Sequence, residues 1–96
     1  MAVSTGRFAD FLQSVFDARR VLAEFLITDL DVALTFLEIA RTSNNSETVE
    51  RNLKNAGTAY EAVLRYLPRA HATKAEQQSI QEKLASVKAL LDTFAG

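Results

Sequence analysis

Apolar side chains recur at intervals of three and four residues along most of this chain, which is the spacing of one face of an α-helix. The longest such stretch runs from Arg7 to Arg41 and contains neither Pro nor Gly. Its apolar residues fall into four neighbouring helical columns: Phe8, Val15, Leu22 and Phe36; Leu12, Leu26, Ala33 and Ala40; Phe16, Leu30 and Leu37; and Phe11, Phe25, Val32 and Ile39. We expect these columns to form a covered flank.

Acidic residues occupy another column of the same stretch, one at every seventh position: Asp10, Asp17, Glu24, Asp31 and Glu38. This acid column is predicted to lie in solvent, opposite the apolar flank, as an ordinary outer helix face. Arg20 is spaced to pair with its acids within the helix. A negatively charged rail for a basic partner is the alternative interpretation.

A continuous helix over residues 7–41 would be about 52 Å long at 1.5 Å per residue. The segment Thr28-Asp-Leu-Asp31 has the pattern of a helix start, and a break there would give a four-helix arrangement. The apolar phase nevertheless passes through this segment unshifted, so we expect one continuous or bent helix.

A polar loop, Thr42-Ser-Asn-Asn-Ser46, follows, and Ser46 is the expected N-cap of a second helix at about 47–67. Pro68 stops that helix because it has no amide hydrogen to donate. Apolar residues recur along it at alternating steps of four and three: Val49, Leu53, Ala56, Tyr60, Val63 and Leu67.

A third helix is predicted at about 74–95, and it opens with the capping box Thr73-Lys-Ala-Glu76. Short connections make consecutive helices antiparallel neighbours. The sequence therefore predicts one all-α domain over residues 1–96, an antiparallel three-helix bundle with an overlong first helix.

The predicted helix lengths do not match. Helices of about 21 residues reach about 31 Å and cover only part of the first. Covering its C-terminal half leaves a group of large apolar residues without an intramolecular partner: Phe8, Phe11, Leu12, Val15 and Phe16. Soluble monomers rarely expose such a patch. Either the first helix folds back or a second copy covers it, and we favour a homodimer.

Two charged residues, Arg19 and Asp29, interrupt the apolar flank. They lie about 15 Å apart along the helix axis, too far to pair within one helix. In an antiparallel dimer, Arg19 would meet Asp29 or Asp17 of the other copy, so Arg19 joins the predicted self-association residues. Alternatively, each marks the edge of the covered region, with the Arg19 head group in solvent.

Gly57 lies inside the second helix, where Gly costs about 1 kcal/mol relative to Ala. We expect a bulky side chain of the first helix, Phe36 or Leu37, to pack closely against it. A partner groove at Gly57 and Tyr60 is the alternative interpretation.

Composition narrows the function. The net charge of −1 argues against nucleic-acid binding, which usually relies on an excess of Lys and Arg. With no Cys, and with a lone His71 expected in an exposed loop without a role, the chain offers no catalytic, cofactor-binding or metal-binding motif, and we predict no enzyme. No signal-peptide pattern is visible and no window has the roughly 20 apolar residues of a membrane span, so we expect a cytoplasmic protein.

Three partial resemblances bear on function. The spacing Ala56-x-x-x-Tyr60-x-x-Val63-x-x-x-x-Pro68 resembles the second helix of a tetratricopeptide repeat, although the first-helix half of that motif finds no match. The three helices from Thr28 onward resemble microtubule-interacting-and-transport domains. The runs 34–40 and 63–68 are similar to short bacterial helical proteins, which implies nothing about activity.

The first two resemblances imply an adaptor that binds a peptide or partner helix in an inter-helix groove. The sequence itself favours a small non-enzymatic interaction protein that self-associates through the N-terminal half of its first helix. The peptide-binding adaptor is the alternative.

Overall fold

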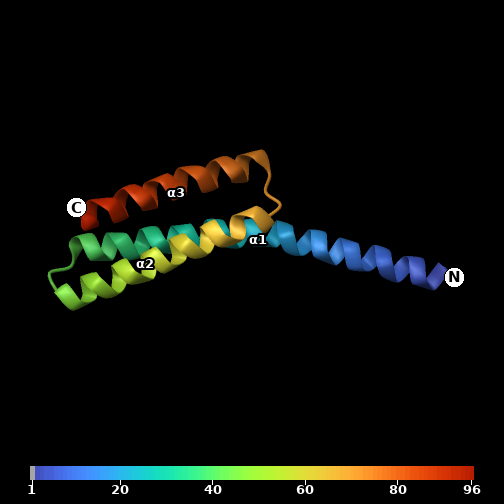
Figure 1. The fold of residues 1–96 in the computed structure, drawn as a ribbon, viewed down its shortest axis with the longest axis horizontal. Coiled ribbons are helices and arrows are strands. Elements are labelled where there is room, and N and C mark those ends of the chain that lie inside the picture. Colours follow the sequence, from blue (N-terminus) through green and yellow to red (C-terminus); the bar gives the residue numbers. More distant parts are fainter. Residues whose placement is uncertain (1) are drawn as a thin grey trace.

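The computed structural model describes residues 2–96, with side chains described for residues 6–96. The chain forms three α-helices and one short 3₁₀ turn: α1 (Ala2–Thr42), α2 (Ser46–Tyr66), η1 (Leu67–Arg69) and α3 (Lys74–Ala95). Figure 1 shows α2 returning along α1 and α3 reversing direction again beside it. The predicted all-α three-helix bundle with an overlong first helix is confirmed.

α1 passes through Thr28–Asp31 without interruption, so the four-helix alternative is wrong. The reason lies in the core, where Leu26, Leu30, Ala33 and Leu37 stay buried on one line of the helix. A break would displace that line from its partners. α1 also begins at Ala2, five residues before the predicted position 7.

The ends of α2 and α3 follow local hydrogen bonding. Asn45, and not Ser46, caps α2, because its side-chain oxygen accepts a hydrogen bond from the Thr48 amide at 3.0 Å. At α3 the predicted capping box is confirmed. The Glu76 amide donates to the Thr73 hydroxyl at 3.1 Å, and the Thr73 amide donates to the Glu76 carboxylate at 2.9 Å.

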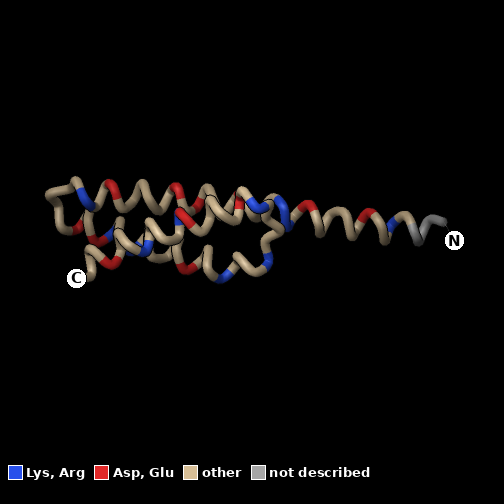
Figure 2. Tube along the Cα trace, turned by 90° about the horizontal axis from the view of Figure 1, so that it is seen from above, with Lys and Arg blue, Asp and Glu red and all other residues tan. Residues whose placement is uncertain are grey.

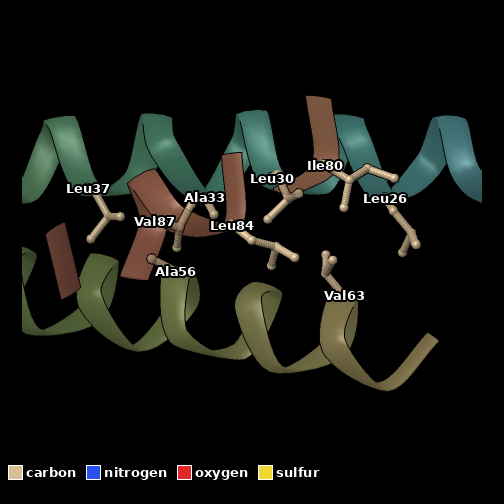
Figure 3. Close-up of a cluster of buried hydrophobic side chains, with 9 residues drawn as sticks. All are labelled: Leu26, Leu30, Ala33, Leu37, Ala56, Val63, Ile80, Leu84 and Val87. Atoms are coloured by element: carbon tan, nitrogen blue, oxygen red, sulfur yellow. The ribbon is translucent and has the colours of Figure 1, made fainter. Parts of the chain in front are cut away.

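The core lies where the C-terminal half of α1 meets α2 and α3 (Figure 3). All three helices contribute buried aliphatic residues to it: Leu26, Leu30, Ala33 and Leu37; Ala56 and Val63; Ile80, Leu84 and Val87. Burying a side chain as large as Leu or Val stabilises the fold by about 1.5–3 kcal/mol. The buried residues of α1 and α2 belong to the apolar positions predicted for these two helices.

One of the four apolar columns of α1 is not covered. Phe11, Phe25, Val32 and Ile39 are exposed, although the spacing placed them on the covered flank. Two neighbouring helices cover only part of the circumference of α1, and this column lies beyond their reach. The prediction of a single covered flank is wrong for Phe25, Val32 and Ile39, whereas Phe11 belongs to the group predicted to lack an intramolecular partner.

The expected close neighbour of Gly57 is also absent. A Cβ atom built at Gly57 meets no described heavy atom within 4 Å. Phe36 and Leu37 pack elsewhere in the core region, so close helix approach does not explain this glycine.

Candidate functional site

The N-terminal half of α1 extends beyond the bundle as a single helix (Figure 1). The molecule measures 66 × 25 × 16 Å, and its long dimension follows α1. Every residue from Gly6 to Arg19 is exposed, and the first buried residue of α1 is Ala23. Fourteen described residues of helix therefore lack the tertiary burial that usually stabilises a helix in water.

This projecting segment carries the predicted apolar residues, which we call the N-terminal patch: Phe8 (63% exposed), Phe11 (63%), Leu12 (50%), Val15 (37%) and Phe16 (44%). Phe8, Leu12 and Val15 follow the helical spacing that leads through Leu26 and Leu30 into the core. The patch thus continues the core face of α1 into solvent.

The connection between α2 and α3 closes the bundle at the inner end of the patch. The His71 amide donates to the Arg19 carbonyl oxygen at 2.9 Å, and the His71 ring lies 4.7 Å from the Phe16 ring, centroid to centroid. His71 is exposed, as predicted, yet it contacts α1. Arg19 therefore sits at the boundary between patch and bundle, with an exposed side chain.

A second contact reinforces this boundary. Arg20 approaches the Glu76 carboxylate at 3.9 Å, where the sequence predicted pairing with the acid column of its own helix. The hydrogen bond from the Thr73 backbone amide is the main factor that lowers the pKa of Glu76. The hydrogen bond with the Thr73 side chain and the Arg20 charge lower this pKa further. The first turn of α3 is thus tied to α1 beside the patch.

All five residues of the acid column are exposed. Figure 2 shows acidic residues spaced along the projecting half of α1 as well as along the bundle. Lys83 of α3 pairs with Asp31, and Arg41 pairs with Glu38 at 2.6 Å and lowers its pKa by hydrogen bonding. Among the ion pairs of the described residues, none includes Asp10, Asp17 or Glu24.

The predicted partner groove lies away from a surface hollow at one end of the bundle. That hollow, of about 470 Å³, separates the end of α2 from the start of α3, and it is lined by Leu67, Ala70, Ala72, Lys74, Gln77, Gln78 and Gln81. Neither Gly57 nor Tyr60 lines it. Tyr60 is half-buried and packs against the core, and Gly57 faces open space.

Across residues 6–96, no three His, Cys, Asp or Glu side chains lie close enough together to hold a metal ion. In the part of the chain that the structure describes, no helix combines the length and the apolar character needed to cross a membrane.

The exposed apolar column of α1 forms a second candidate surface: Phe11, Phe25, Val32 and Ile39. The sequence contains the pattern of this surface, because steps of three and four residues continue along it through small residues between the large apolar ones. The spacing of apolar residues alone does not determine which of the two apolar faces of α1 packs against the neighbouring helices.

The fold and these surfaces define a helical bundle with a projecting first helix. Comparisons with protein-family models, with curated proteins and with solved structures found no match to this chain. The resemblances to tetratricopeptide repeats and to microtubule-interacting-and-transport domains therefore stay predictions.

Proposed function

We propose that this chain is a small non-enzymatic interaction protein that associates with a second copy of itself through the N-terminal patch. The observation that carries the proposal is the projecting segment, in which every residue from Gly6 to Arg19 is exposed while five are large and apolar. We expect this association in the cytoplasm.

The energetic argument rests on burial. A large apolar side chain gains about 1.5–3 kcal/mol when it moves from water into an apolar contact, and the patch holds five such side chains. Contiguous apolar surface of this kind usually marks an interaction site.

The choice of a second copy follows from α1 itself. Its continuous course removes the fold-back that would have covered the patch within one chain. A two-fold dimer buries the same patch on both copies and requires no other component. α1 projects beyond the bundle (Figure 1), so the patch is open to a partner except at its inner end, where the Phe16 ring contacts His71.

Charged substitutions on the patch test the proposal. In the variant Phe8→Glu with Leu12→Lys, both changes lie on the core-facing side, and the new charges pair one helical turn apart. This variant should be monomeric with α2 and α3 still folded, as a retained cooperative melt of the helical dichroism signal would show. The control, Asp10→Glu with Ser14→Lys, puts the same charge pair at two exposed positions outside the patch and should remain dimeric.

Native mass spectrometry and size-exclusion chromatography read out the difference. A wild type and patch variant of equal mass would refute the proposal. Loss of the dimer in both variants would contradict the assignment to the patch, because a charge pair outside the patch would then disrupt association equally.

A further inference from the structure

α1 carries a second apolar surface between Phe11 and Ile39, which we call the outer stripe. It follows alternating steps of three and four residues, all exposed: Phe11, Ser14, Ala18, Val21, Phe25, Thr28, Val32, Thr35 and Ile39. From Phe11 to Ile39 it spans about 42 Å. Most of it lies on the bundle half of α1, so it is distinct from the N-terminal patch and shares only Phe11 with it.

The stripe has the form of a helix-packing seam. Residues alternating at three and four present the a and d positions through which helices pack in coiled coils. Val21, Glu24, Phe25 and Thr28 line a surface hollow of about 150 Å³. Four residues at this spacing form the hole that receives one side chain from a facing helix.

The small polar residues of the stripe are compatible with burial. The Thr35 hydroxyl donates to the Asp31 carbonyl oxygen within α1 at 3.1 Å. A docked helix would therefore cover the Thr35 methyl group without leaving its hydroxyl unpaired, which avoids the cost of a buried unsatisfied donor.

One border of the stripe is acidic throughout. The acid column runs beside it, and Glu24 lines the hollow together with Val21 and Phe25. Asp31 and Glu38 have cations of this chain beside them, whereas the described ion pairs leave out Asp10, Asp17 and Glu24. The negative border is therefore least neutralised along the N-terminal part of the stripe.

A second copy of the chain does not complement this border. Antiparallel pairing along the stripe would place acid column against acid column. Parallel pairing would place it against the other border, which holds no cation: Phe8, Val15, Leu22, Asp29 and Phe36. Both orientations leave the acids unpaired or facing Asp29.

We propose that the outer stripe docks an amphipathic helix of another protein, with apolar residues at alternating steps of three and four and Lys or Arg along the flank that meets the acid column. Burial along the stripe supplies affinity, and the acids select the partner, since charge at such borders governs partner choice more than binding strength.

Two synthetic probe peptides of about 28 residues, enough to span the stripe, test this proposal. Both carry Leu at the alternating seam positions. One carries Lys at the flanking positions and the other carries Glu there. Fluorescence anisotropy with the full chain should show that the Lys peptide binds with a Kd lower by about tenfold or more.

Substitutions in the chain then locate the binding. Phe25→Glu should raise the Kd of the Lys peptide about tenfold or more, because it puts a charge at the centre of the seam. Leu64→Glu is the matched control on α2, with comparable exposure, and should leave the Kd unchanged. The patch variant Phe8→Glu with Leu12→Lys should also leave it unchanged, which separates this proposal from self-association.

Equal affinity for the two peptides, or binding of neither, would overturn the proposal. Unchanged binding to Phe25→Glu would overturn it too, because the peptide would then be held by the acids alone. If Phe25→Glu instead converts a dimeric wild type into a monomer, a second copy occupies the stripe and the proposal is wrong.

Discussion

At the scale of single residues, Gly57 is the position where stability is most easily gained. Its Cβ direction is open, so Gly57→Ala adds a methyl group without a clash. The variant should gain about 1 kcal/mol, the helix-propensity difference between the two residues. Thermal melts should show a rise of about 4–8 °C.

The larger variant Gly57→Leu provides a check on the same point. It should also be at least as stable as the wild type, because its Cβ atom meets no described atom within 4 Å and Leu favours helix over Gly. A lower melting temperature for both variants would mean that a bulky neighbour packs there after all.

Glu76 gives the fold a pH-dependent contribution. Its pKa is lowered from 4.5, mainly by the Thr73 backbone amide, so the folded state favours the charged carboxylate. That stability is present above the ordinary pKa and is lost as the pH falls through the lowered one. Glu76→Gln keeps the hydrogen-bond acceptor but removes the charge, and it should melt below the wild type at pH 7.

The gap between the two melting temperatures should begin to close as the pH falls below 4.5 and should vanish below the lowered pKa of the folded state, where the wild-type carboxyl is neutral. Melts of both proteins at neutral and acid pH measure it. A gap that stays constant with pH would show that the Glu76 charge contributes nothing.

Residue-level signals were predictable where one local pattern decides the outcome. The capping box at Thr73 was such a case, since hydroxyl and carboxylate need only each other. At the start of α2 two adjacent residues competed for the cap, and Asn45 prevailed over Ser46. The burial of Asn52 could not be predicted from its residue type. It depends on the hydrogen bond that its side-chain amide donates to the Thr48 carbonyl oxygen.

At the scale of the helices, α1 divides into a half stabilised by tertiary packing and a half that is not. The same substitution on the same face distinguishes them. Leu30→Ala should cost about 2–5 kcal/mol, because Leu30 is fully buried. Leu12→Ala, at a half-exposed site, should change the stability of the monomer by no more than about 0.5 kcal/mol.

Urea denaturation at low protein concentration measures both variants. Equal losses would mean that the projecting half of α1 is packed within one chain, contrary to the exposure of its side chains.

Helix existence and approximate bounds could be predicted because propensity, capping and Pro68 act locally. The covered side of α1 could not, because two seams share the same spacing. α2 and α3 pack against the side of α1 that carries Leu26 and Leu30, so these two residues are buried. Phe25 and Val32 lie on the side that remains exposed. That choice depends on contacts between helices, which local periodicity does not record.

At the scale of the whole molecule, the unequal helix lengths dominate. They could be predicted from residue counts alone, and they lead to the projecting segment and its patch (Figure 1). Both surfaces are exposed in the described part of the chain, so the partners proposed for them are tested by measuring association.

Sedimentation equilibrium of the wild type, from the low to the high micromolar range, tests self-association most directly. The proposal predicts a mass that rises towards twice the 10.6 kDa of one chain as concentration increases. A mass that stays at 10.6 kDa across the whole range would contradict it.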